Sequence, residues 1–530
     1  MLGRERSAKH LSCAVNLDRL IRKVARNSGF SAVGFMVVAG LVFVVTPYAL
    51  RKLGSERFAI WALGGVVNAY AQLADFGISR ALVKYVAEYE ARRDFVKLNA
   101  VVNTGLMLYV GLALTGGVAL LALRGVFIGP LFDIPPELQA EAWFVFTGLI
   151  LISVWNLLFG TFESLLNGMQ RLDLTQTLST VMQALSAVGV FIALETGYGL
   201  RGLVFKNAFI AGVSGLVYLY LARRTFADLH FNWRLFDAVR ARELLRFGSN
   251  IQVVNIVVLL LEPLNKTLLS RFLSLSFVTY YEIATRIISQ VVGLFQALAL
   301  AIFPAAAEVD ANRGRAAVTQ MCGRATRYMA ILALPVFSLL ILLGESFIRA
   351  WVGPDYQVAA VTLQLLAVAR FVSVLGMPAY FIVQGIGQPR LSATASIYTG
   401  ISGLLLSAGM LMAFGYYGLV IGNALAMASG SLLMLFLFHR VTRASRRALF
   451  ESLPGRATIT NLVFAGLSAL ILTHLRPASL PVLGLWAVVY LALYGFGLFL
   501  VGAFDAEDRR VFQYLMPGLW ADLLERTPLV

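Results

Sequence analysis

Apolar runs of about twenty residues recur along almost the whole chain, with short polar segments between them. A run of that length is what an α-helix needs to cross the hydrocarbon core of a bilayer. The pattern therefore predicts an all-α polytopic membrane protein. Fourteen spans are expected, at residues 29–50, 58–79, 99–123, 143–164, 174–194, 200–222, 248–272, 278–304, 326–344, 358–384, 391–414, 417–439, 458–475 and 481–503.

Residues 1–28 have a different pattern. Leu17, Leu20, Ile21 and Val24 fall at helical spacing between arginines and lysines. This predicts an amphipathic helix on the cytoplasmic membrane surface. The basic part is too long for a cleavable signal, and no small-residue cleavage site follows a short apolar core.

Composition agrees with a membrane protein, because only 14% of the 530 residues are charged and 59% are hydrophobic. Soluble domains carry about 25% charged residues. The net charge is +16, and with the N-terminus inside about 32 of the 44 Lys and Arg residues fall in cytoplasmic segments. That asymmetry predicts cytoplasmic N- and C-termini and explains the basic excess without nucleic acid.

An internal repeat is visible at an offset of about 220 residues. The sequence AEYEARRD from Ala87 resembles AEVDANRG from Ala307, and KLGSERFAIW (52–61) parallels RFLSLSFVTY (271–280). Six helices separate equivalent points, so both repeats have the same orientation, as in parallel-repeat transporters, and the substrate path is expected between them.

The predicted organisation follows from this repeat and from the interfacial helix. The longest loop has about 25 residues, which leaves no room for a catalytic domain outside the membrane. The expected parts are the interfacial helix 1–28, a six-helix N-lobe 29–222, a basic cytoplasmic linker 223–247, a six-helix C-lobe 248–439, and residues 440–530 with two extra helices and a cytoplasmic tail.

Four predicted helices carry a polar face, and such a face must look at protein or water. A charge in mid-membrane costs about 2.5–3.5 kcal/mol even on lenient insertion scales. One shared hydrated cavity is therefore expected. Its candidate substrate-binding residues are Asn68, Gln72 and Asp75 in the second helix, Gln252, Asn255, Glu262 and Lys266 in the seventh, Glu282 and Arg286 in the eighth, and Arg370 in the tenth.

The charges in the spans favour an anionic passenger. The spans contain five cations and only two acids, Glu262 and Glu282, with Asp75 near a helix end. The cations are Lys206, Lys266, Arg271, Arg286 and Arg370.

A structural alternative to a binding role stays open. Glu262–Lys266 and Glu282–Arg286 have i,i+4 spacing and could serve only helix packing. Lys206 and Arg271 lie near helix ends, from which they could reach the interface. Pro263 predicts a kink.

The sequence lacks the motifs typical of metal binding, ATP binding and nucleophilic catalysis. His10, His230, His439 and His474 all lie outside the middle of the spans and lack metal-ligand spacing. The chain has no GxxxxGK[ST] loop for ATP and no pairing of a nucleophile with a base. We therefore expect a non-enzymatic protein without a metal or cofactor.

Four segments resemble the polysaccharide transporter family, which shares a superfamily with multidrug and toxic-compound extrusion transporters and with peptidoglycan-precursor flippases. They are YALRKLGSERFAIWALGGVVNAYAQLADFGISRALVKYVAEY (48–89), NKTLLSRFLSLSFVTYYEIATRI (265–287), FPAAAEV (303–309) and WVGPDYQVAAVTLQLLA (351–367). The resemblance covers about residues 30–505. Family members often have an acid-plus-Lys pair in helix seven. Here Asn265-Lys266 occupies that place, with Glu262 one turn earlier.

The resemblance implies two lobes, alternating access and a glycan linked to a lipid pyrophosphate as passenger. The leading hypothesis is a flippase that moves an undecaprenyl-pyrophosphate oligosaccharide, for O-antigen or exopolysaccharide, from the cytoplasmic to the periplasmic leaflet of the bacterial inner membrane. Membrane lipids, a glycan polymerase and glycosyltransferases are the expected partners of a monomeric chain.

Two alternatives stand beside this hypothesis. One is an ion-coupled multidrug or small-molecule antiporter on the same fold. The other is a membrane glycan polymerase or acyltransferase, a class that usually needs a large outer loop or an intramembrane histidine. The energy source and the identity of the sugar leave no signal in the sequence.

Overall fold

The computed structural model describes residues 40–73, 75–300, 302–442, 454–474 and 479–504, except for the side chains of residues 249–262, 304, 313 and 473. All regular secondary structure in these residues is helical. The predicted interfacial helix 1–28 lies outside the described residues.

The chain folds into two compact units. The first comprises Met1–Ala301 and Pro389–Gly430, and the second comprises Ile302–Gln388 and Ser431–Val530. The predicted N-lobe and C-lobe remain a prediction.

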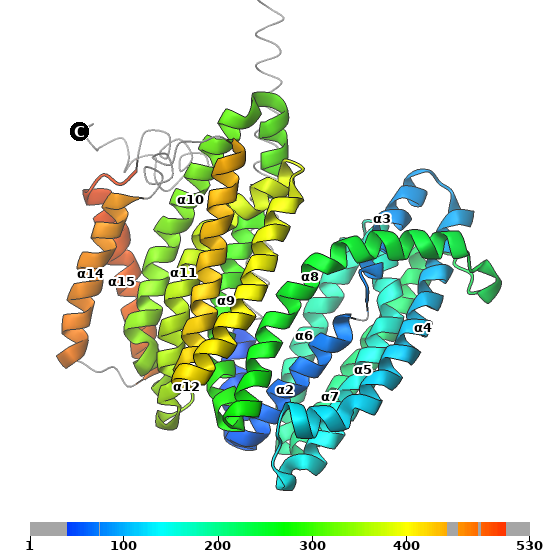
Figure 1. Ribbon diagram of the computed structural model, residues 1–530, viewed down its shortest axis with the longest axis horizontal. Coiled ribbons are helices and arrows are strands. Elements are labelled where there is room, and N and C mark those ends of the chain that lie inside the picture. Colours follow the sequence, from blue (N-terminus) through cyan, green and yellow to red (C-terminus); the bar gives the residue numbers. More distant parts are fainter. Residues whose placement is uncertain (1–39, 74, 301, 443–453, 475–478, 505–530) are drawn as a thin grey trace, which may run out of the picture. The chain divides into compact units, whose positions relative to one another are not determined.

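In the first unit, helix α5 (Pro136–Gly168) is the central element. It packs against α2, α3, α4, α6 and α7 (Figure 1). The other described helical elements of this unit are residues 40–53, α2 (Ser55–Leu73), α3 (Ile78–Ala91), α4 (Phe95–Val126), the π-helical turn η1 (Phe127–Leu131), α6 (Leu172–Glu195), α7 (Gly199–Thr225), the 3-10 turn η2 (Trp233–Leu235), α8 (Ala238–Phe272), α9 (Leu275–Leu300) and the first part of α12 (Pro389–Thr442).

In the second unit, helix α10 (Ile302–Trp351) packs against α11 (Gln357–Gly385), α14 (Gly455–His474) and α15 (Leu480–Leu500). The short turn η3 (Pro354–Tyr356) and the last part of α12 complete the described elements. Polar bonds join the last two helices to α10. The Tyr490 hydroxyl donates to Asn461 Oδ1 at 3.0 Å, and Asn461 Nδ2 donates to Ser338 Oγ at 2.7 Å.

Two long helices are each broken at one glycine. Gly314 in α10 has φ +73°, and Gly415 in α12 has φ +64°. Glycine adopts this left-handed conformation without the steric penalty of a side chain. The break at Gly415 separates the predicted spans 391–414 and 417–439. The break at Gly314 falls inside the repeated sequence AEVDANRG.

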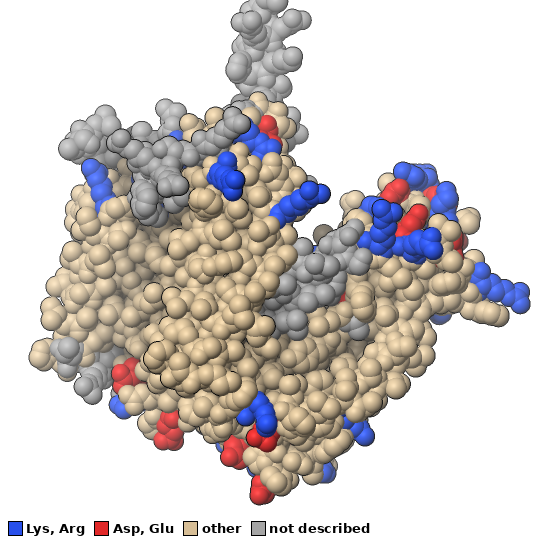
Figure 2. Space-filling model, in the orientation of Figure 1, with Lys and Arg blue, Asp and Glu red and all other residues tan. Residues whose placement is uncertain are grey.

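The prediction of an all-α polytopic membrane protein is confirmed. Ten helical stretches within the described residues are long and apolar enough to cross a membrane. One of them is α12, which contains two predicted spans. Residues 40–53, α2 and α8 are helical where three further spans were predicted. Figure 2 shows charged side chains gathered at helix ends, including the α3–α4 turn, with a broad uncharged surface between those ends.

The helix boundaries in the structure differ from the predicted ones at two places. The linker 223–247 is not a loop throughout, because α8 begins at Ala238, where the Asp237 carboxylate accepts the backbone N–H groups of Val239 and Arg240. The predicted span 58–79 corresponds to α2, which ends at Leu73, and it runs past the turn at Phe76 and Gly77, both with positive φ, into the first two residues of α3. Hydropathy marks the part of a helix that lipid covers, and it does not register polar extensions or tight turns.

Candidate functional site

Glu282 on α9 is held between two cations in the first unit. Its Oε2 lies 2.7 Å from Lys266 Nζ on α8, and its Oε1 accepts from Arg286 Nε at 2.6 Å. The three side chains are 9%, 11% and 27% exposed, respectively. Charges so far from water need partners, because each loses its hydration. One carboxylate therefore neutralises half of the cationic charge, and the cluster retains a formal charge of +1.

The hairpin of α8 and α9 produces this cluster. The two helices are joined by a tight turn at Leu273 and Ser274. Lys266 lies two turns before the end of α8, and Glu282 lies two turns after the start of α9, so the antiparallel packing sets them opposite each other. Arg286 follows Glu282 by one turn on the same face.

This arrangement corrects the sequence-based view of the charges. Only pairs within one helix were predicted, whereas Lys266 reaches Glu282 across the hairpin. The predicted Glu282–Arg286 pair is present. The side chain of Glu262 lies outside the described residues, so its predicted pair with Lys266 stays a prediction.

Neighbouring helices fix the position of Arg286. Its Nη1 donates to Thr46 Oγ1 at 3.2 Å, and its guanidinium lies 5.1 Å from the centre of the Phe58 ring. Thr279 on α9 donates through Oγ1 to the carbonyl of Ser55 at 2.7 Å. These contacts attach α9 to the helix of residues 40–53 and to α2, and they fix the position of the guanidinium.

A cavity of about 420 Å³ opens beside the cluster. It is lined from α2, α5, α7, α8 and α9. Its polar lining is Asn68, Asn156, Asn207, Ser214, Lys266, Glu282 and Arg286. Asn68 is oriented by Ser153, whose hydroxyl donates to Asn68 Oδ1 at 2.9 Å. The site thus offers amide groups and a net positive charge. These suit a ligand that carries an anionic group next to hydroxyl groups.

Two further polar cavities lie in the same unit. One of about 450 Å³ is lined by Asp75, Ser79, Arg80, Tyr109, Asn156, Glu163 and Asn167, among others. Another of about 310 Å³ is lined by Asn156, Glu163, Ser179, Gln183, Ser186 and Tyr218, among others. Asn156 lines all three cavities. Asp75 accepts from Ser79 Oγ at 2.9 Å and from the Tyr109 hydroxyl.

The structure separates the predicted site residues into five groups. Asn68, Lys266, Glu282 and Arg286 line the 420 Å³ cavity together. Asp75 lines the 450 Å³ cavity, and Gln72 is exposed outside the lining of all three cavities. The side chains of Gln252, Asn255 and Glu262 lie outside the described residues. Arg370 is half-buried on α11 in the second unit.

The two cations expected to snorkel have protein partners. Arg271 Nη1 lies 3.2 Å from Asp133 Oδ2, near the end of η1. Lys206 Nζ on α7 donates to Ser186 Oγ on α6 at 2.9 Å, and neither lysine nor serine lines the 420 Å³ cavity. Both cations therefore make contacts between elements.

Sequence reasoning missed the polar stripe of α5. Ser153, Asn156, Gly160, Glu163 and Asn167 recur at intervals of three or four residues, which places them on one helix face. All of them except Ser153 line the cavities described above. The spacing was available in the sequence, but small residues and amides interrupt an apolar run less visibly than charges do.

Comparisons with known proteins agree with this architecture. The family described as "Polysaccharide biosynthesis protein" matches residues 24–310. A proposed O-antigen transporter of Shigella flexneri is 20% identical over 425 residues, which is 79% of this chain and 98% of the relative. A probable low-salt glycan biosynthesis flippase of Haloferax volcanii is 20% identical over 429 residues, or 81% of this chain and 85% of the relative.

Solved structures show the same fold. The lipid II flippase MurJ, in an inward closed conformation, superposes with a TM-score of 0.66 at 12% identity, covering 93% of this chain and 99% of the other. An inward-facing multidrug resistance transporter of the MATE family gives a TM-score of 0.66 at 16% identity, covering 78% of this chain and 98% of the other. Since the family match spans more than half of the sequence, the chain belongs to the polysaccharide biosynthesis protein family.

Proposed function

We propose that this protein is a flippase that carries an oligosaccharide linked to undecaprenyl pyrophosphate from the cytoplasmic to the periplasmic leaflet by alternating access. The observation that carries the proposal is the 420 Å³ cavity, in which Lys266 and Arg286 share the single carboxylate of Glu282. The names of the two relatives support a glycan as passenger, and the membrane-spanning fold supports transport.

The negative charges of the pyrophosphate contribute most of the free-energy cost of moving this substrate across the membrane. Each is expensive to dehydrate in a low-dielectric path, and cations at partial depth replace the lost water. Without a bound substrate, the Glu282 carboxylate offsets one of the two positive charges of Lys266 and Arg286. A pyrophosphate competes with that carboxylate, so the net attraction is moderate and the passenger can leave. Asn68, Asn156 and Asn207 supply amide groups for phosphate oxygens or sugar hydroxyls.

The remaining parts of the proposal follow from orientation and pathway. The cytoplasmic termini follow from the distribution of Lys and Arg. We place the protein in the bacterial inner membrane as a monomer, beside the glycosyltransferases that assemble its substrate and the polymerase that consumes it. Gln252, Asn255 and Glu262 of the first unit and Arg370 of the second unit are also proposed as substrate-binding residues.

A transport assay in proteoliposomes tests the function. The probe is a fluorescent undecaprenyl-pyrophosphate oligosaccharide, and its arrival in the outer leaflet is measured by a quencher that cannot cross the membrane. We expect Lys266→Gln and Arg286→Gln each to slow flipping by roughly tenfold, since each removes a charge-assisted contact. Lys206→Gln is the matched control, because it removes a membrane-embedded lysine of the same unit outside the cavity.

The same preparation distinguishes the antiporter alternative. Wild-type protein that leaves the labelled glycolipid in its original leaflet but expels a cationic dye along a proton gradient would overturn the proposal. If Lys206→Gln and Lys266→Gln lose flipping equally, the effect is not specific to the 420 Å³ cavity, and the cavity would not be the substrate path.

A further inference from the structure

The segment between α7 and α8 is held against α4 by two asparagine side chains. Asn99 Nδ2 donates to the carbonyl of Asp228 at 2.6 Å, and Asn99 Oδ1 accepts the His230 N–H at 3.0 Å. One turn on, Asn103 Nδ2 donates to the His230 carbonyl at 2.8 Å, and its Oδ1 accepts the Asn232 N–H at 2.9 Å. The two amides pair with alternate linker residues, much as a neighbouring β-strand would.

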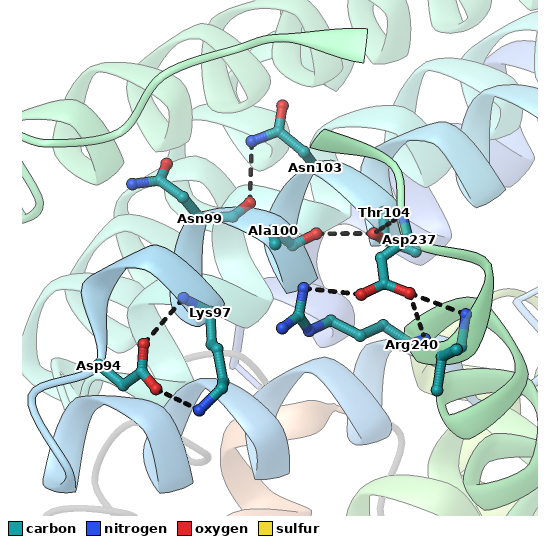
Figure 3. Close-up of polar contacts among 9 residues, drawn as sticks. Asp94, Lys97, Asn99, Ala100, Asn103, Thr104, Asp237 and Arg240 are labelled. Carbon is teal, nitrogen blue, oxygen red and sulfur yellow. Dashed lines mark hydrogen bonds and ion pairs between the residues drawn. The ribbon is translucent and has the colours of Figure 1, made fainter. Parts of the chain in front are cut away.

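A third contact continues the series into α8. Thr104 Oγ1 accepts the Asp237 N–H at 3.1 Å while donating to the Ala100 carbonyl at 2.7 Å (Figure 3). The carboxylate of Asp237 then caps α8 and lies 3.0 Å from Arg240 Nη1. We call Asn99, Asn103 and Thr104 the α4 latch. Its five bonds to the linker backbone fix which linker side chains face inward and which face outward.

The held linker presents apolar side chains on its outer surface. Phe226 and Leu229 are buried under it. Trp233 and Phe236 at the two ends of η2, and Val239 in the first turn of α8, are exposed, with 75% of Trp233 and 68% of Val239 accessible. Large exposed apolar side chains that lie this close together in the chain make this segment a candidate interaction surface.

Cations surround these apolar groups. Residues 223–247 contain six arginines against three acidic residues. Arg223, Arg224, Arg234 and Arg242 are exposed. Two of them lie over aromatic rings of the linker: Arg223 is 5.0 Å from the centre of the Phe231 ring, and Arg234 is 5.7 Å from that of Trp233. The surface therefore combines positive charge with aromatic and aliphatic groups.

We propose that this surface, made of Trp233, Phe236, Val239 and the exposed linker arginines, binds anionic phospholipid headgroups of the cytoplasmic leaflet. The linker joins Thr225, the end of one membrane span, and packs on the first turns of another, α4, so it lies at the level of the headgroups. Tryptophan favours that interface, and arginines near it attract anionic lipids. The α4 latch couples the bound lipid to α4 and, through Asp237, to the start of α8.

A fluorescent label at position 233 tests the proposal in the full-length protein. Trp233→Cys is made in a Cys13→Ser background, where the remaining Cys322 is buried, and is labelled with an environment-sensitive dye. The protein is reconstituted in phosphatidylcholine vesicles with or without phosphatidylglycerol. We expect a blue shift of the dye with phosphatidylglycerol that high salt reverses, because salt screens charges at the surface.

Charge and latch variants separate the two contributions. In Arg223→Gln/Arg234→Gln, the concentration of phosphatidylglycerol needed for the half-maximal blue shift should rise roughly tenfold. The matched pair Arg390→Gln/Arg440→Gln, which is also exposed, should leave that concentration unchanged. Asn99→Ala/Asn103→Ala should weaken the response without any change of charge, and a spin label at position 233 should become more mobile. That increase in mobility should be absent in the arginine pair.

Two outcomes would overturn the inference. A dye that stays in water in both kinds of vesicle would mean that the surface faces the cytosol, as a protein-binding site would. A blue shift of equal size in both vesicles, insensitive to salt and to the arginine pair, would mean apolar burial without recognition of anionic lipid.

Discussion

Gly77 and Gly248 meet backbone to backbone in the first unit. A Cβ atom on Gly77 would lie 2.4 Å from the carbonyl oxygen of Gly248, and a Cβ on Gly248 would lie 2.5 Å from the carbonyl oxygen of Phe76. Gly77 also has φ +71°, which disfavours any other residue. Helix α8 therefore crosses the α2–α3 turn with no room for a side chain, ten residues after its first residue.

The first prediction uses this close approach. Gly248→Ala should destabilise the protein by about 1–3 kcal/mol, since backbone atoms must move to admit the methyl group. Gly111→Ala is the matched control, because Gly111 is also helical and its added Cβ would have no neighbour within 4 Å. There alanine should be neutral or stabilising by up to about 1 kcal/mol. Thermal unfolding in detergent compares the two, and equal melting temperatures would contradict the tight crossing.

The second prediction compares two acids of the first unit. Glu282→Gln leaves Lys266 and Arg286 without their shared carboxylate, which should cost about 3 kcal/mol or more. Glu163 makes no hydrogen bond or ion pair with the residues that the structure describes, although it lines two cavities. Glu163→Gln should therefore change stability by less than about 1 kcal/mol. Denaturant titration of both variants measures the difference.

Transport gives a second readout for the same pair. Glu282→Gln should bind the anionic substrate more tightly and release it more slowly, because the competing carboxylate is gone. A Glu282→Gln variant as stable as wild type would mean that Lys266 and Arg286 have other compensation. Unchanged flipping in that variant would place the cluster outside the transport path.

The third prediction concerns orientation. Reporter fusions after Arg240 and Arg446 should read cytoplasmic, and fusions after Asp133 and Asp355 should read periplasmic, as the distribution of Lys and Arg requires. A periplasmic signal at Arg240 would place the linker and its arginines on the opposite side. It would then contradict both the fourteen-span topology and the lipid surface proposed for the linker.

Hydropathy was enough to find the long apolar helices of the described residues, because lipid demands apolar residues over a fixed length of helix. Lys266, Glu282 and Arg286 were found for the related reason that a membrane tolerates few unexplained charges. The pairing of Lys266 with Glu282 was missed because it depends on the turn at Leu273, and sixteen residues separate the two in sequence.

Other features leave weaker signals. Asn156 and Glu163 were missed although their spacing shows them on one face of α5, because the residues between them are strongly apolar. The α4 latch acts on backbone groups of Asp228, His230 and Asn232, so the identity of the linker residues carries no record of it. Backbone recognition of this kind needs a three-dimensional structure.

The last prediction concerns pH and the start of α4. Asp94 is the N-cap of α4: its Oδ1 accepts the Lys97 N–H at 3.1 Å, and its Oδ2 lies 2.6 Å from Lys97 Nζ. The bonds from the Lys97 side chain and backbone hold the pKa of the Asp94 carboxyl below its ordinary value. A depressed pKa stabilises the folded state above the unfolded pKa of about 3.9, and the contribution disappears as pH falls through the lower folded value.

Asp94→Asn and Asp94→Ala separate the cap from the charge. Asparagine caps a helix about as well as aspartate but cannot form the ion pair, whereas alanine does neither. Amide exchange in the first turn of α4, corrected for intrinsic rates, should thus be slowest in wild type and fastest in the alanine variant at neutral pH. As pH falls below about 3.9 and through the lower pKa of folded Asp94, wild type should converge on the asparagine variant while alanine stays faster, since the charge is lost and the cap remains. A difference between wild type and asparagine that persists at low pH would show that the carboxylate charge is not what stabilises this turn.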